Sequence, residues 1–198
     1  MANFLDKIFG SKIEVDLLKI ELEAKLCFHE SRIDSHLVSL VSERLDAEKQ
    51  QAFLHYLRDV AAVSEGQDIS ASKEVNLLQR YIAFYQEVMG DALILRFDCQ
   101  SESDRPLPAF VLFPLIRNAL VHGYNSMEKF PLKIKIRLFD KALQLDVSNH
   151  VNHHIASQED NPLIDRFKSR LISLYGEQQQ LLFNSNSHTF KSNLHIRA

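Results

Sequence analysis

The histidines are the first side chains in this sequence whose spacing suggests chemistry. The chain has 9 of them, and His150, His153 and His154 gather in the string NHVNHH. Neutral imidazoles bind zinc well, so this cluster is a candidate metal site. It has no cysteine and no pair of histidines on a helix, and it lies in a polar stretch. The pattern therefore favours a solvated loop over a metal centre.

A second histidine stands next to a carboxylate, in the string LCFHESR that contains His29, Glu30 and Arg32. A neutral imidazole nitrogen can attack phosphorus in line, and an adjacent carboxylate can orient the ring or take its proton. A single His-Glu pair on a helix also describes an ordinary surface histidine. The pair alone therefore leaves both interpretations open.

The third candidate is the string LIRNALVHG, residues 115–123. It is mostly apolar, yet it carries Arg117 and Asn118 in the middle and His122 at its end. An amide oxygen is a hard ligand of the kind that magnesium prefers. A cationic side chain immediately before it would repel such an ion.

Composition limits the classes of protein that this chain can represent. It has 198 residues, 45% of them hydrophobic, and a net charge of −3, which does not indicate a nucleic-acid-binding surface. No apolar run approaches the roughly 20 residues of a membrane helix, and the N-terminus does not read as a signal peptide. The two cysteines, Cys27 and Cys99, suggest no disulfide framework. We expect a reduced, cytoplasmic protein.

The first third of the chain is predicted to be a helical hairpin. Apolar residues recur at helical spacing on two faces of residues 12–45, with polar interruptions at Ser31 and Asp34, and a connection is expected at 46–48. Helical spacing resumes to residue 63. Two apolar faces indicate cover on more than one side, and two such hairpins in a dimer would make a four-helix bundle.

The rest of the chain alternates between strand and helix patterns. Ser72 is expected to cap a helix that ends at Gly90, and strands are expected at 93–99, 132–139, 143–147, 179–185 and 189–196. Further helices are expected at 109–123 and 162–175, with a polar loop at 150–161 between them. The fold class is therefore predicted to be α+β, an antiparallel helical hairpin followed by a sheet with helices on one face.

Four strings together resemble the LytS-type sensor histidine kinases. They are SKEVNLLQRYIAFYQEVMGDALILRFDC, LPAFVLFPLIRNALVHG, DVSN and RFKSRLISLYG, in this order over roughly residues 72–176. Several weak motifs in one order are stronger than any one of them. The resemblance implies a dimerising hairpin that carries a phosphorylated histidine, over residues 1–66. It implies a GHKL-type ATP-binding α/β sandwich over residues 67–198.

The resemblance also assigns a nucleotide site. Asn118 falls where the family holds the magnesium that bridges the phosphates of ATP. Asn149 falls where an adenine-binding Asp often stands, and its amide can still hydrogen-bond a base.

Three departures from the family's pattern argue against ATP. Arg117 replaces the acidic residue that precedes the family's Asn, and a guanidinium neither ligates a cation nor accepts a proton. Asn161 and Leu163 stand where two glycines usually let backbone amides approach phosphates. The expected lid, 150–161, contains no glycine. The sequence thus predicts a vestigial nucleotide site at Asn118 and Asn149.

The family places its phospho-acceptor histidine in the first helix of the hairpin. The QRYI match at 79–82 and the connection at 46–49 place the equivalent position near His29. The local string resembles the H-E-x-R box of ordinary histidine kinases, which implies an orienting or base role for Glu30. His36, seven residues on, is the reserve candidate.

The favoured hypothesis is a histidine phosphotransfer protein of two-component signalling, a phosphorelay intermediate derived from a kinase. His29 would exchange a phosphoryl group with the Asp of a response-regulator receiver domain. The receiver would supply magnesium, so this chain would need no cofactor of its own. Two alternatives remain: an ATP-dependent histidine autokinase with an atypical lid, and a non-catalytic pseudokinase that regulates by binding. All three predict a homodimer and no nucleic-acid or membrane partner.

Overall fold

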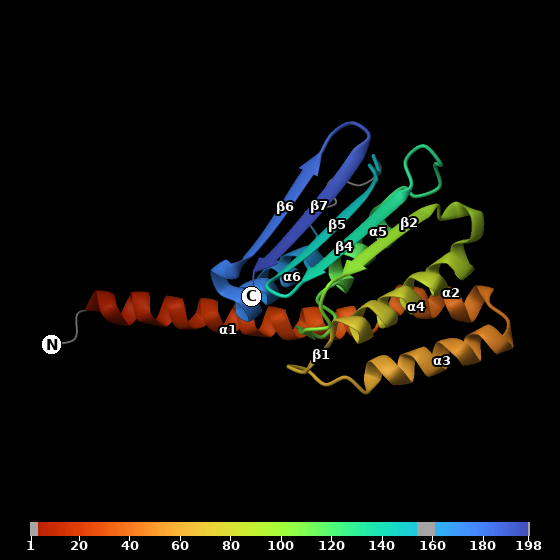
Figure 1. Ribbon diagram of the computed structural model, residues 1–198. Helices are drawn as coiled ribbons and strands as arrows, with labels where there is room; N and C mark the ends of the chain where they lie inside the picture. Colours follow the sequence, from red (N-terminus) through yellow and green to blue (C-terminus); the bar gives the residue numbers. More distant parts are fainter. Residues whose placement is uncertain (1–3, 154–160, 198) are drawn as a thin grey trace.

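The N-terminal helices form an antiparallel hairpin whose first arm is broken. The computed structural model describes residues 4–153 and 161–197, with side chains described from residue 16 onward. The first arm consists of α1 (Phe4–Arg32) and α2 (Ser35–Arg44), and α3 (Ala47–Ala61) returns beside it (Figure 1). The sequence predicted one continuous helix, which is wrong at residues 33–34. Asp34 ends that continuity because its carboxylate caps α2, accepting the N–H groups of His36 and Leu37 at 3.0 and 3.4 Å.

α3 is longer than α2, and this difference determines which residues meet at the open end of the hairpin. The connection was predicted at 46–48 and lies at 45–46, where Asp46 caps α3 through the N–H of Lys49 at 2.9 Å. α2 has 10 residues and α3 has 15. At about 1.5 Å per residue, the end of α3 extends past α2 to the last turn of α1.

A short two-stranded sheet follows, which the sequence did not predict. β1 (Asp68–Ser70) pairs antiparallel with β3 (Pro106–Pro108). α4 (Ala71–Met89) begins directly after β1. Its N-cap is Ser70, which accepts the N–H of Lys73 at 3.2 Å, and the expected cap at Ser72 is wrong. Ser72 lies inside the first turn and donates its own N–H to Asp104.

The main sheet has five strands in the order β2-β4-β5-β7-β6. They are β2 (Leu95–Ser101), β4 (Leu132–Phe139), β5 (Ala142–His150), β6 (Gln179–Ser185) and β7 (Thr189–Arg197). β2 and β4 are parallel, and the other neighbours are antiparallel. The predicted 132–147 hairpin and the last two predicted strands are confirmed. In β4 and β5 apolar side chains are buried on one face and polar ones lie on the other.

Two helices pack on the buried face of this sheet. α5 (Phe113–His122) is shorter than predicted, because Phe110 takes a φ of 61° and residues 109–112 form a loop. α6 (Pro162–Tyr175) has the predicted limits, with Asn161 as its N-cap and Gly176 after it at a φ of 54°. Short 3₁₀ turns follow α4 at Gly90–Ala92 and α6 at Gly176–Gln178.

The layers are the sheet, then α4, α5 and α6, then the hairpin (Figure 1). The core is continuous from the sheet to the hairpin: α1 packs on α6 and α5, and α2 packs on α4. The predicted α+β class is confirmed. The division into domains at residue 66 and the dimeric bundle stay predictions.

Candidate functional site

His29 lies in the last turn of α1 with about half of its side chain exposed. Its Nδ1 is 3.4 Å from a guanidinium nitrogen of Arg32, and its Nε2 is 3.6 Å from a carboxylate oxygen of Glu65. Arg32 can only donate, so Nδ1 accepts and the ring hydrogen lies on Nε2, facing Glu65. The imidazole is therefore open to solvent, with a cation on one nitrogen and a proton acceptor beside the other.

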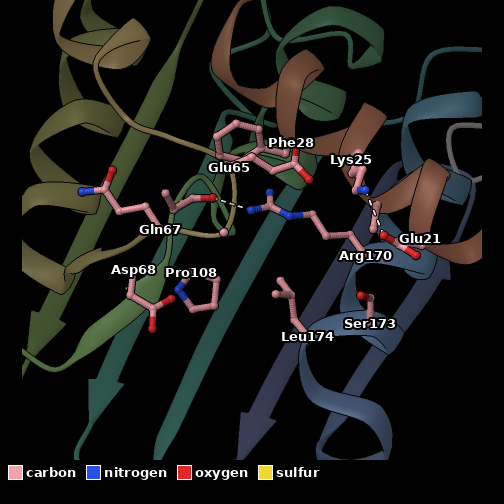
Figure 2. Close-up of a pocket in the computed structure, with 13 residues that line it drawn as sticks. Glu21, Lys25, Phe28, Glu65, Gln67, Asp68, Pro108, Arg170, Ser173 and Leu174 are labelled. Atoms are coloured by element: carbon pink, nitrogen blue, oxygen red, sulfur yellow. Dashed lines mark hydrogen bonds and ion pairs between the residues drawn. The ribbon is translucent and has the colours of Figure 1, made fainter.

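Glu65 reaches His29 because α3 extends past the start of α2. The same overlap brings the carbonyl of Val63 to Arg32, which donates to it at 3.3 Å. Glu65 also lines a hollow of about 260 Å³, which lies between α1, α6 and the turn that follows α3 (Figure 2). Sequence reasoning missed Glu65, because the break at 33–34 that makes α2 shorter than α3 was not predicted.

Glu30, the carboxylate expected to orient His29, lies on another side of α1. Its side chain forms an ion pair with Arg166 of α6, and its backbone carbonyl accepts from Arg117 at 2.6 Å. Successive residues on a helix point about 100° apart, which explains why neighbours in sequence meet different partners. The orienting role of Glu30 stays a prediction, and Glu65 is the carboxylate found at His29.

His36, the reserve candidate, lies exposed in the first turn of α2. It is close enough to His122 of α5 to act on that group electrostatically. Burial lowers the pKa of His122, and the charges of Arg117 and His36 lower it further. Among the described residues, no hydrogen bond, ion pair or ring contact joins His29 and His36.

Arg117 binds the break between α1 and α2. One guanidinium nitrogen lies 3.3 Å from Asp34 Oδ1. Asp34 is buried, and its other oxygen accepts the hydroxyl groups of Tyr81 and Tyr85 of α4 at 2.7 Å each. Burial and the nearby negative charge raise the pKa of both tyrosines, so both hydroxyls stay protonated donors. Arg117, which stands where the family has an acid, thus holds the hairpin on the layer formed by α4 and α5.

Asn118 is buried in α5 and faces the start of α6. Its side-chain oxygen accepts from the amide of Asn161 at 2.8 Å, while the other end of Asn161 caps α6 through the N–H of Ile164. A hollow of about 260 Å³ beside it is lined in part by Glu30, Arg117 and Arg166. Two guanidinium groups and an amide oxygen already engaged by Asn161 do not fit a magnesium ion.

Asn149, the second predicted nucleotide-site residue, is buried in β5 and packs on the end of α5. A Cβ added to Gly123 would lie 2.6 Å from the Asn149 amide nitrogen and 2.5 Å from the carbonyl of Ala119. Gly123 is therefore required by close packing at this point. Asn149 also donates to the carbonyl of His150 at 2.8 Å.

A buried Glu-Arg network fixes the loop between β3 and α5. Glu74 accepts the N–H groups of Phe110 and Leu112 at 2.8 and 3.1 Å, and burial raises its pKa to about 7. Arg170 of α6 donates to the carbonyls of Ala109 and Phe110 and lies 5.4 Å from the ring centre of Phe28 (Figure 2). α1, α4 and α6 are thereby tied to the loop that leads to Asn118.

The histidine cluster does not form a metal centre in the described part of the chain. Within residues 4–153 and 161–197, no group of three His, Cys, Asp or Glu side chains is arranged to hold a metal ion. His150 instead packs against Phe130 and Tyr124, with ring centres 4.8 and 6.0 Å away. His154 lies outside the described residues.

Comparison with known proteins supports the resemblance. The chain is 28% identical over 137 residues to the sensor histidine kinase YpdA of Escherichia coli strain K12. The chain is a relative of the sensor histidine kinases. The match covers 62% of this chain and 24% of YpdA, so the chain corresponds to about a quarter of that kinase. No family model matches.

Solved structures with a similar arrangement include kinases and a phosphotransferase. The histidine kinase domain of the Erythrobacter litoralis EL346 blue-light-activated kinase matches with a TM-score of 0.48 and 16% identity, over 90% of this chain and 95% of that one. A bacterial phosphotransferase matches with a TM-score of 0.46 and 10% identity, over 89% and 96%. Separately, no helix among the described residues is long and apolar enough to cross a membrane.

Proposed function

We propose that this histidine kinase-like chain is a histidine phosphotransfer protein, and that His29 exchanges a phosphoryl group with the Asp of a response-regulator receiver domain. The surroundings of His29 support this proposal most strongly. The ring is half exposed, Nε2 faces Glu65, and Arg32 lies at Nδ1. A receiver can reach a side chain placed in this way.

The proposed transfer uses the groups at His29 in defined roles. The bond between phosphorus and the Asp oxygen breaks, and its electron pair stays on the receiver's carboxylate. The new bond forms from the lone pair of Nδ1 to phosphorus, and as the ring becomes positively charged the hydrogen of Nε2 passes to Glu65. Arg32 stabilises the charge on the phosphoryl oxygens. The return transfer runs through the same steps in reverse.

The surroundings of Asn118 support transfer without ATP. Arg117 and Arg166 bring positive charge to the place where the family holds magnesium, and Asn161 engages the Asn118 oxygen. In the proposed function the receiver supplies the magnesium. Asn118 and Asn149 then remain as packing residues of a former nucleotide site.

Exposed apolar residues on α1 support a homodimer. Helical spacing puts on one face Leu18, Leu22 and Leu26 of α1 and Ile33 just after it, which are between 41 and 66% exposed. Leu37 and Leu40 continue the apolar spacing into α2 but are buried, because α2 packs on α4. A contiguous apolar surface of this kind is typical of an interface. A second copy that covers it would complete the proposed four-helix bundle.

Incubation with phosphorylated receiver domains tests the proposal. A panel of receivers, each loaded from radiolabelled acetyl phosphate, is mixed with the full chain, and label on the chain is measured. We expect acid-labile label from at least one receiver, its loss in His29→Gln and its retention in His36→Gln. Label that survives in His29→Gln would contradict the assignment. A His29→Gln chain that still acts normally in cells would favour the pseudokinase alternative.

A further inference from the structure

The outer face of the main sheet, away from all the helices, carries a concentration of lysines. Lys133 and Lys135 alternate along β4, Lys191 lies on β7, and Lys129 precedes β4. All four are exposed. They line a hollow of about 510 Å³. The hydroxyl-bearing residues Ser148 and Thr189 line it as well.

The lysines outnumber the carboxylates beside them: Asp98 and Asp146 are the cross-strand neighbours of Lys135, whereas Lys133 and Lys191 have no acidic neighbour in the register. Among the described residues, no ion pair involves any of the four. Asp146 is the carboxylate that lines the hollow, and it accepts a hydrogen bond from Asn193. The chain as a whole has a net charge of −3, so the positive charge here runs against the overall balance.

Strand register holds the amines around one centre. Lys133 pairs with Ser148, and Ser148 pairs with Lys191 on the next strand. At about 4.8 Å per strand the two lysine backbones are roughly 10 Å apart, and Lys135 lies about 7 Å along β4. Like charges at this spacing repel one another, and an anion placed between them relieves the repulsion.

We propose that this hollow is a binding site for a compact polyphosphate, either an inorganic chain or the phosphates of a nucleotide. Four amines around one hollow can neutralise several phosphate groups at once. A ligand with a single carboxylate would use only part of this positive charge. The site is independent of the proposed phosphotransfer function. It lies on the sheet face opposite the helices that carry His29 and Asn118 (Figure 1).

Phe130 is expected to distinguish the two possible ligands, a nucleotide and an inorganic polyphosphate chain. It lines the hollow, and its ring lies parallel to that of His188 at 5.6 Å, with the Lys129 amine 5.3 Å from its centre. A nucleotide base can gain from an aromatic ring at the rim, whereas an inorganic chain gains nothing from it.

Calorimetric titration of the full chain with sodium tripolyphosphate, without magnesium, tests the site. We expect saturable one-to-one binding that weakens as salt is raised. The double variant Lys133→Ser, Lys135→Ser should weaken it at least tenfold. Lys141→Ser is the matched control, because Lys141 is exposed at the opposite end of the same hairpin, and it should leave the affinity unchanged. Arg166→Met should also leave it unchanged, which separates this site from the hollow beside Asn118.

Two further titrations identify the source. Tighter binding of ATP than of tripolyphosphate, reduced to equality by Phe130→Ala, would identify a nucleotide site, and equal affinities would identify an inorganic chain. Three results would overturn the proposal: no saturable binding, equal weakening by Lys141→Ser or by Arg166→Met, or tighter binding of a decaglutamate peptide than of tripolyphosphate. The last would indicate an acidic protein partner.

Discussion

The two sides of the helix end at residues 29–34 have opposite character. On one side His29 is half exposed, and its neighbours Arg32 and Glu65 make contacts longer than 3.3 Å that solvent can reach. On the other side Asp34 is buried and receives two tyrosine hydroxyls and a guanidinium. A few residues thus separate an accessible imidazole from a closed polar network. The buried network at Asp34 holds the end of α1, and with it His29, in place.

The residues expected at the nucleotide site lie in this closed region. Arg117, Asn118 and Asn161 lie on the closed side, and each is engaged by a protein group. In place of an acid that could serve magnesium, the chain has a cation that binds its own hairpin. Arg117 attaches the end of α1 to α5, at the position where the family has an acid before its magnesium-binding Asn. This contact supports the proposed loss of ATP chemistry.

The largest expected effect is the removal of the buried carboxylate. Asp34→Ala leaves Arg117, Tyr81 and Tyr85 without their common partner, which should lower the free energy of unfolding by about 3–5 kcal/mol. Urea denaturation measures the change. Asp46→Ala is the matched control, because Asp46 caps α3 from an exposed position, and it should cost only about 1 kcal/mol. Equal costs would show that the closed network adds nothing beyond a helix cap.

A second buried carboxyl group, that of Glu74, should make the stability of the protein depend on pH. The pKa of Glu74 is raised to about 7 from an ordinary value of 4.5, so the folded state holds its proton more tightly than the unfolded state. Stability should therefore fall as pH rises from about 4.5 to 7, by roughly 3 kcal/mol, and change little above that. Denaturation of the wild type and of Glu74→Gln across this range measures the difference. A wild-type curve parallel to that of the variant would contradict the expectation.

On the open side, Glu65→Gln should change the rate of transfer and leave stability unaltered. Without a carboxylate to take the Nε2 proton, transfer from a phosphorylated receiver should slow by about 10²-fold. Rapid-quench kinetics measure this rate. Glu21→Gln is the control, since Glu21 lines the same hollow but pairs with Lys25, and its rate should stay within twofold. The proposed role of Glu65 fails if both variants transfer at the wild-type rate.

The smallest effect is expected at Glu30. Its ion pair with Arg166 is about one third exposed on each side, so Glu30→Gln should cost less than about 1 kcal/mol. The rate of transfer to His29 should stay near that of the wild type, because Glu30 points toward α6. A loss of rate like that expected for Glu65→Gln would restore the role that the sequence suggested for Glu30.

Local signals predicted much of the fold, and contacts distant in sequence account for what was missed. The limits of α6 follow from Asn161-Pro162 and Gly176, and the β4–β5 hairpin follows from strict alternation. The β1–β3 pair escaped notice because each strand has three residues and β3 contains two prolines. Phe110 shows no sequence sign of its positive φ, which Glu74 and Arg170 hold from distant helices.

At the candidate site, too, single residues were predicted, but their partners from distant parts of the chain were not. His29 and Asn118 were predicted by resemblance, and Arg117 was recognised as a departure. The partners of these residues were not predicted, because Glu65 is 36 positions from His29 and Asp34 is 83 positions from Arg117 along the chain. Asp34 had been noticed only as a polar interruption. An acid that breaks an apolar stripe and a cation that breaks another apolar helix were in fact the two halves of one contact.

We propose that this chain has an open phosphoryl site at His29 and a closed nucleotide site at Asn118. A comparison of two donors on the same protein tests it most directly. The full chain is incubated separately with labelled magnesium-ATP and with a labelled receiver, and the phosphate is mapped by mass spectrometry. We predict phosphate on His29 from the receiver and none from ATP. Phosphate on any histidine from ATP alone would contradict the account.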